Sequence, residues 1–189
     1  MPARRRMGRL FRPVTFALLL VALPAYAGDR SLEYAVKAAF LYKFASFVDW
    51  PPGSFETESS PFVLCVVGAD PFGGRIRSAA NGQTVGSHPI ILRQLAKEEP
   101  RSNCHAMFVS GSDGKSASEA LNSVRGTPTL TVTDSALGPT AGIIHFVIAD
   151  DRVTFDIDNA AAARNHLVIS SKLLALARRV NTARPAAVP

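Results

Sequence analysis

The chain has 189 residues, 47% of them apolar, with 21 lysine and arginine residues against 15 aspartate and glutamate residues. This apolar share excludes intrinsic disorder as the main state. Five arginines and no acidic residue lie in residues 1–27, so the rest is nearly neutral, and the pI of 9.8 does not indicate a nucleic-acid-binding surface.

Residues 1–27 have the composition of a secretory signal peptide. Arginines precede a largely apolar run over residues 14–23, and Ala25 and Ala27 are small residues at the positions that signal peptidase reads. The apolar run is too short to span a bilayer. We therefore expect cleavage near Ala27 and a periplasmic protein. Arg5-Arg6 leaves the twin-arginine export route open beside the Sec route.

The remaining chain has the length of one domain, which we expect over residues 28–180, followed by a flexible Pro/Ala-rich tail over residues 181–189. Leu32, Val36, Phe40 and Phe44 recur at helical spacing and predict one apolar stripe on a helix over residues 31–48. Trp50-Pro51-Pro52 should end that helix.

Apolar runs predict the strands that follow. Residues 62–67 should be covered on both faces, and further strands are expected at Val85 with residues 89–92, at 106–109 and at 129–133. Asp70 is expected to cap a short helix that extends through residues 76–80, and residues 116–124 have helical composition.

The last third of the chain predicts a hairpin of residues 143–148 and 153–157 at a sheet edge. Asn159 should cap a helix over residues 160–164, and Ser170 a final helix over residues 171–180. The fold class that follows is α/β: a mostly parallel sheet flanked by helices on both faces, with an antiparallel C-terminal hairpin at one edge.

Cys65 and Cys104 are the only cysteines in the sequence. In an oxidising compartment such a pair is most often a disulfide, which here would close a loop of about 39 residues and contribute roughly 4 kcal/mol. Two free buried thiols are the alternative. A redox-active pair is not indicated, because the C-x-x-C spacing is absent.

No residue pattern indicates an active site, a metal centre or a cofactor. The histidines lack metal-ligand spacing, and the acidic pairs lie at a hairpin tip or along one strand instead of across a cleft; these residues are His88, His105, His145, His166, Asp150, Asp151, Asp156 and Asp158. We therefore expect no enzymatic activity.

Gly68, Asp70, Gly73 and Gly74 belong to a loop after the first long strand, where doubly wound sheets bind phosphate. The loop lacks the glycine spacing of a phosphate-binding motif, and Pro71 removes a donor. An ordinary strand-to-helix turn is the simpler interpretation, but a weak contact with an anion or small ligand stays open.

Several stretches, taken in order, resemble the YfiR-like family. They are Tyr34–Ala45, Val48–Pro51, Phe62–Gly68 with Asp70-Pro71-Phe72, Cys104-His105, Leu130–Asp134, Gly142–Phe146, Val153–Ile157 and Leu167–Ala177. The resemblance implies a periplasmic α/β domain without catalytic activity. Such a protein represses an inner-membrane diguanylate cyclase by binding its periplasmic domain, and so controls cyclic di-GMP and biofilm formation.

The resemblance also implies that an outer-membrane peptidoglycan-binding lipoprotein can sequester the repressor, and that Cys65 and Cys104 form the family's shared disulfide. Some members have a second cysteine pair near residues 140–155, which this chain lacks. Asn165-His166 stands where small residues are usual, so the loop before Leu167 is expected to differ.

Leu167, Ile169, Leu173 and Leu174 are candidate partner-binding residues, because an exposed apolar patch there would mark a contact site. A C-terminal helix that simply docks on the sheet is the alternative. Two functions follow. The first is a non-enzymatic periplasmic regulator, expected as a homodimer without nucleic acid. The second is a periplasmic small-ligand sensor whose site lies at the loop of residues 68–74.

Overall fold

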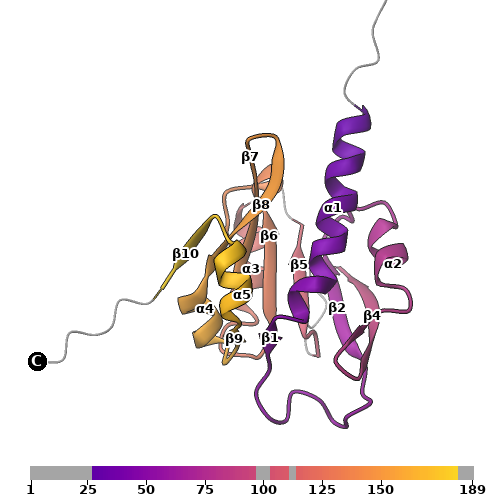
Figure 1. Cartoon of the computed structure of the whole chain (residues 1–189), viewed down its shortest axis with the longest axis vertical. Coiled ribbons are helices and arrows are strands. Elements are labelled where there is room, and N and C mark those ends of the chain that lie inside the picture. The colour runs from indigo at the N-terminus through magenta and orange to yellow at the C-terminus, as the bar shows by residue number, and fades with distance from the viewer. Residues whose placement is uncertain (1–26, 97–102, 111–113, 183–189) are drawn as a thin grey trace, which may run out of the picture.

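The computed structural model describes residues 27–96, 103–110 and 114–182 (Figure 1). The expected signal peptide therefore lies outside the described residues except for Ala27, and so does the expected tail beyond residue 182. The expected boundaries of the signal peptide, domain and tail stay predictions.

Within the described ranges, one sheet of eight strands forms the centre of the molecule. Across the sheet the strands are β10 (Arg179–Asn181), β8 (Arg152–Asp158), β7 (Ile144–Ala149), β6 (Leu130–Asp134), β5 (Ala106–Val109), β2 (Phe62–Val67), β4 (His88–Leu95) and β3 (Thr84–Val85). Neighbours from β4 to β7 are parallel, as are β8 and β10, whereas β7–β8 and β3–β4 are antiparallel.

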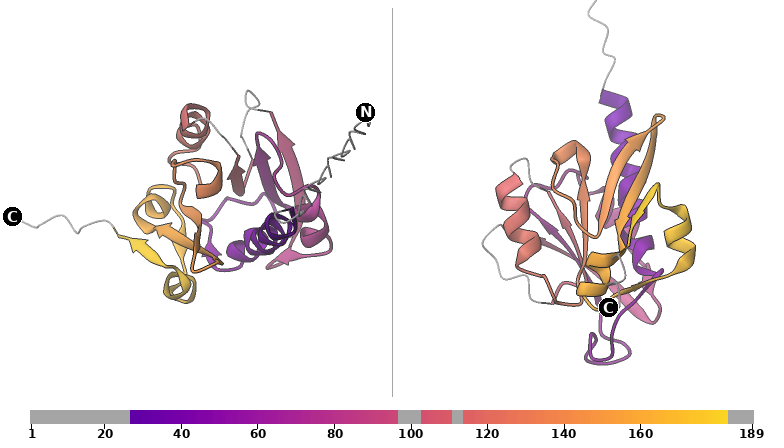
Figure 2. Two further views of the ribbon diagram at one scale, coloured as in Figure 1. Left: turned by 90° about the horizontal axis from the view of Figure 1, so that it is seen from above. Right: turned by 90° about the vertical axis from the view of Figure 1, so that its left-hand side faces the viewer.

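Helices cover both faces of this sheet, as Figure 2 shows. One face packs against α1 (Ala27–Ala45) and α2 (Arg75–Ala80), and the other against α3 (Gly114–Asn122). The chain is completed by a short 3-10 turn, η1 (Ser135–Leu137), and by α4 (Asn159–Arg164) and α5 (Ser171–Leu176). The expected fold class is confirmed.

Strand β2 explains how the two layers are built from one apolar run. Phe62, Leu64 and Val66 face the cluster under α1, whereas Cys65 and Val67 face the cluster under α3. Because successive side chains of a strand point to opposite faces, a run without alternation is buried on both sides. The prediction of a doubly covered strand is confirmed.

The predicted boundaries of α1 and α5 need correction. Helix α1 begins at Ala27 instead of residue 31 and ends at Ala45 instead of residue 48. Val48–Asp49 forms the strand β1, which pairs antiparallel with β9 (Val168–Ile169). Helix α5 ends at Leu176 instead of residue 180. Its expected last turn becomes β10, which pairs with β8, so the hairpin stands one strand in from the edge.

The expected caps are partly wrong. Asp70 does not cap α2; its carboxylate accepts hydrogen bonds from the backbone N–H groups of Phe72 and Gly74. Helix α4 is capped by Asp158 instead of Asn159. The Oδ1 atom of Asp158 accepts a hydrogen bond from the N–H of Ala161 at 2.7 Å. Ser170 caps α5 as predicted.

Candidate functional site

An apolar groove of about 430 Å³ lies between α1 and the tip of the β7–β8 hairpin. Leu32, Val36 and Phe40 line it from α1, and Ile148 and Val153 line it from the hairpin. Leu32 is 66% exposed, Val36 37% and Ile148 46%. Single exposed apolar side chains are ordinary, but a contiguous group of them marks a contact surface. These residues are called the α1–hairpin groove below.

The sequence builds both walls of the groove from simple patterns. Leu32, Val36 and Phe40 follow one another at a spacing of four, so they form one stripe along α1. Ile148 pairs with Val153 across the hairpin. Asp150 and Asp151 form the turn with φ of 49° and 56°, a left-handed conformation that aspartate tolerates and that two-residue hairpins need.

The rim of the groove is charged. Glu33 lines it from α1, and Asp151 and Arg152 line it from the hairpin. Two carboxylates against one guanidinium give the rim an acidic excess. A segment that binds here should therefore be apolar along its centre and basic at its margin.

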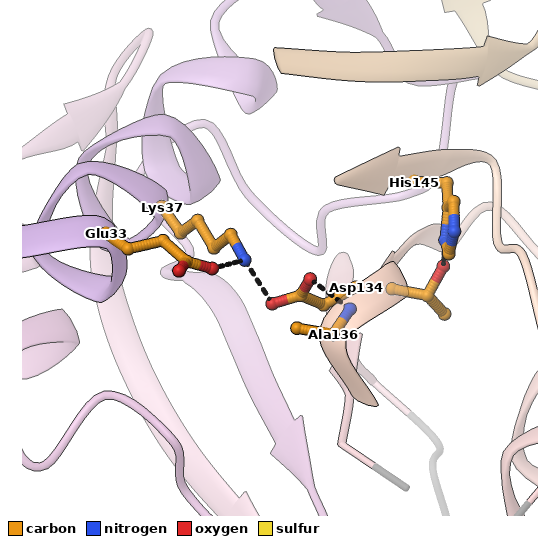
Figure 3. A network of polar contacts seen from close by, with 6 residues as sticks. Glu33, Lys37, Asp134, Ala136 and His145 are labelled. Carbon is orange, nitrogen blue, oxygen red and sulfur yellow. Dashed lines mark hydrogen bonds and ion pairs between the residues drawn. The ribbon is translucent and has the colours of Figure 1, made fainter. Parts of the chain in front are cut away.

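A buried ion-pair network lies beside the groove (Figure 3). Lys37 has no exposed surface, and its Nζ donates to Asp134 Oδ2 at 2.6 Å and to the Glu33 carboxylate. Asp134 Oδ1 accepts from the N–H of Ala136 at 3.0 Å. Because Asp134 ends β6 and Lys37 lies in α1, this network fixes the helix that forms one groove wall to the end of the sheet.

Tyr34 completes the surroundings of Lys37, whose Nζ lies 4.9 Å from the centroid of the phenol ring. Burial, and after it the nearby Asp134 carboxylate, raises the pKa of Tyr34 well above its usual value, so the phenol stays protonated. This network was not predicted from the sequence. Its one local signal is the Glu33–Lys37 pair, one helical turn apart.

The structure places the predicted partner-binding residues mainly in the core. Leu167, Ile169 and Leu173 are 3%, 5% and 2% exposed, and Leu174 is half-buried against the same cluster. The exposed apolar side chains of this stretch are Val168 and Leu176, at 62% and 66%. Alternation along β9 turns Ile169 inward and Val168 outward. Contact through the four predicted residues is untested, and three of them present almost no surface.

The predicted ligand loop is closed on itself. The carboxylate of Asp70 accepts hydrogen bonds from two backbone N–H groups of the same loop. A Cβ on Gly68 would lie 2.1 Å from the carbonyl oxygen of Ser110, so this glycine is required by close backbone packing. Gly73 and Gly74 line a shallow hollow with Arg75. Ligand binding here stays a prediction without further support.

Cys65 and Cys104 form a disulfide, as predicted. The bond joins the middle of β2 to the residues just before β5, and both cysteines are buried in the cluster under α3. The alternative of two free thiols is wrong.

Two histidines hold the loop that follows Trp50. The rings of His88 and His105 stack on either side of Phe55, with centroid distances of 3.7 and 4.4 Å. His105 accepts the N–H of Val63 at Nδ1 and donates from Nε2 to Ser54 O, which is the pattern of a neutral ring. Burial lowers the pKa of His105 below its usual value.

A polar row crosses β6, β7 and β8. Thr133 Oγ1 lies 2.8 Å from His145 Nδ1, and His145 stands opposite Asp156 in the strand register. The order of these residue types is that of a hydrolytic triad, but Thr133 is only 2% exposed and its oxygen already accepts the N–H of Gly142. A substrate therefore has no access to this hydroxyl.

Among the residues that the structure describes, no group of three or more His, Cys, Asp or Glu side chains is arranged to hold a metal ion. In the same part of the chain, no helix is long and apolar enough to cross a membrane.

A family model described as YfiR/HmsC-like matches residues 34–178. No curated protein matches the chain. The matched span contains the disulfide, the Lys37–Asp134 pair and both walls of the α1–hairpin groove apart from Leu32 and Glu33.

Proposed function

Because the chain belongs to the YfiR/HmsC-like family, we propose that it is a non-enzymatic periplasmic regulator that represses an inner-membrane diguanylate cyclase. It does so by binding the periplasmic domain of the cyclase, which lowers cyclic di-GMP and restrains biofilm formation. An outer-membrane peptidoglycan-binding lipoprotein competes for the regulator, which acts as a homodimer. The family resemblance supports each of these statements.

The observation that carries the proposal is the α1–hairpin groove. A repressor of this kind needs a surface that a partner protein can cover. Leu32, Val36 and Ile148 offer adjacent apolar side chains that the other described residues leave exposed. Burying such side chains at an interface contributes roughly 25 cal/mol for each Å² removed from water.

The proposed occupant is an apolar segment of the cyclase's periplasmic domain that carries basic residues at its margin. Charge complementarity supports this choice, because Glu33 and Asp151 outnumber Arg152 on the rim. Fixing α1 through the buried Lys37–Asp134 pair keeps the wall in place before the partner arrives, which reduces the entropic cost of binding.

The test compares two leucines that are equally exposed. Leu32, in the groove, and Leu176, at the end of α5, are both 66% exposed. Each is changed to glutamate in the native host, in a strain that lacks the chromosomal gene. Leu32→Glu should fail to lower cyclic di-GMP and should bind the cyclase domain about tenfold more weakly or worse, whereas Leu176→Glu should act like the wild type.

Both variants change an exposed residue, so the midpoint of thermal unfolding should stay close to the wild-type value and serves as the folding control. Equal repression by both variants would exclude the groove. Loss of repression by Leu176→Glu alone would move the contact to the C-terminal face. Unchanged cyclic di-GMP on deletion of the gene would overturn the proposed function itself.

A further inference from the structure

A second cavity, of about 350 Å³, lies between α3 and α4 and shares no lining residue with the α1–hairpin groove. The connection from β6 to β7 forms its third wall, through Thr140 and Gly142. Polar side chains dominate the lining, among them Ser118 and Asn122 of α3 and Asn165 just after α4. Such a lining favours a hydrophilic ligand over an apolar one.

The cavity carries two guanidinium groups, Arg125 in the turn after α3 and Arg164 in α4. Arg125 donates from Nη2 to the neutral side-chain oxygen of Asn122 at 2.9 Å. Arg164 Nη2 lies 3.9 Å from Asp158 Oδ2, beyond hydrogen-bond distance. Neither arginine is therefore held in a close ion pair by the residues that line the cavity.

Asp158 is the one carboxylate among the lining residues, and one of its two oxygens already accepts a hydrogen bond. Its Oδ1 caps α4 by accepting from the N–H of Ala161. Two positive charges against one negative charge leave the cavity with a net positive charge. Guanidinium groups present several N–H donors in a planar array, which matches the paired oxygens of carboxylate and phosphate groups.

Thr131 supplies a further donor among the lining residues. The residue is 4% exposed, and its Oγ1 accepts from the N–H of Ile143 at 2.9 Å, so the hydroxyl proton remains available. Gly142 packs against Thr131 so closely that a Cβ would come within 3.0 Å of it. The absence of a side chain at this position lets the connection from β6 to β7 pack onto β6.

From these observations we infer that the cavity between α3 and α4 binds a small anion through carboxylate or phosphate oxygens, with Arg125 and Arg164 as the recognising side chains. The cavity volume lies at the lower end of the range for small-molecule sites, about 300–1,000 Å³. The inference goes beyond the proposed docking function, because the groove and this cavity have no residue in common.

The experiment titrates the purified exported protein with sodium phosphate and, separately, with sodium succinate. Sodium chloride at equal ionic strength is the baseline, and amide chemical shifts are the readout. We expect saturable shifts centred on Gly142 and Asn165. Binding of phosphate alone would indicate a phosphoester-type ligand, and binding of succinate alone a dicarboxylate.

A matched pair of double variants makes the test specific. Arg125→Gln with Arg164→Gln should weaken binding by about tenfold or more, because charge-assisted hydrogen bonds are lost. Arg77→Gln with Arg93→Gln removes the same charge from exposed positions on α2 and β4 and should leave binding unchanged. Absence of saturable shifts with both anions, or equal weakening in the two double variants, would overturn the inference.

Discussion

The surroundings of Lys37 are unusual for a lysine, because the side chain has no exposed surface. Lysine is almost never fully buried unless it is paired, and here its Nζ meets Asp134 and Glu33 at the interface between α1 and β6. A buried ion pair contributes little net stability, but removal of one partner leaves the other charge buried and unpaired. The pair therefore specifies where α1 sits more than it stabilises the fold.

Replacement of Lys37 by methionine should lower the free energy of unfolding by roughly 3–5 kcal/mol, because Asp134 would stay buried without its partner. Lys43→Met, on the exposed side of the same helix, should change it by less than about 0.5 kcal/mol. Urea denaturation measures both. Adding Asp134→Asn to Lys37→Met should restore part of the lost free energy of unfolding. If both lysine variants lost the same free energy of unfolding, the buried pairing of Lys37 with Asp134 would be refuted.

His105 makes the stability of the fold depend on pH. Its folded-state pKa lies below the ordinary value of 6.5, first because of burial, so the folded protein resists protonation more than the unfolded chain does. Stability is therefore complete above the unfolded pKa and falls as the pH drops below about 6.5. The pKa of His145 is also lowered, mainly by burial, and contributes with the same sign.

The urea midpoint of the wild type should fall as the pH is lowered from about 7.5 to about 5. This range brackets the ordinary histidine pKa of about 6.5. The His105→Gln variant should show a smaller fall, because one of the two half-buried rings whose pKa is lowered is gone. His166→Gln serves as the control, since His166 is exposed in the turn after α4. An unchanged pH dependence in His105→Gln would show that protonation of this ring is not linked to folding.

At the scale of secondary structure, the side chain of Arg178 adds to the backbone pairing that holds β10 against β8. Arg178 donates from Nε and Nη2 to both oxygens of Asp156, at 2.8 and 2.6 Å, and its backbone N–H donates to Phe155. The Arg178 hydrogen bonds hold the pKa of the Asp156 carboxyl below its usual value. The carboxylate is thus charged at neutral pH and positions β10 against β8.

The amides of β10 should exchange with deuterium about two- to fivefold faster in Arg178→Ala than in the wild type, the scale expected of a partly exposed ion pair. Lys172→Ala, which removes an exposed charge from α5, should leave these amides unchanged. High salt should reduce the difference between Arg178→Ala and the wild type. Equal exchange in all three proteins would mean that backbone pairing alone holds the strand.

Over the whole molecule, the disulfide links segments that are far apart in the sequence. Cys65 and Cys104 are separated by 39 residues, and between them the chain forms α2, β3 and β4. The bond restricts the unfolded chain and so favours the folded state. Since both sulfurs are buried under α3, reduction needs at least local opening of this layer.

Loss of the disulfide in a Cys65→Ala/Cys104→Ala variant should cost roughly 2–5 kcal/mol and lower the midpoint of thermal unfolding. Dithiothreitol should lower the wild-type midpoint after titration confirms free thiols, and should leave that of the double variant unchanged. A wild-type midpoint that stays constant after complete reduction would show that the disulfide does not stabilise the fold.

The sequence alone identified most strands of the sheet and the helices on its faces, because runs such as Phe62–Val67 have their pattern locally. It joined β3 and β4, which are separate antiparallel strands, into one. It did not identify β1, β9 or β10. Strands of two or three residues are too short to have a pattern of their own and form only by pairing with another strand. Val48, for example, pairs with Ile169, which lies far away in the sequence. Lys37 and Asp134 were missed for the same reason, since 97 residues separate them.

The α1–hairpin groove shows most clearly where sequence and tertiary structure divide. The spacing of Leu32, Val36, Phe40 and Phe44 determined that α1 has one apolar stripe, but not how much of that stripe is buried. The structure buries Phe44 against Phe146 and Phe155 and leaves Leu32 and Val36 exposed. Figure 1 shows the reason: the N-terminal part of α1 extends beyond the sheet. Periodicity fixes which side of a helix is apolar, but only the extent of the surface it packs against decides how much of that side is covered.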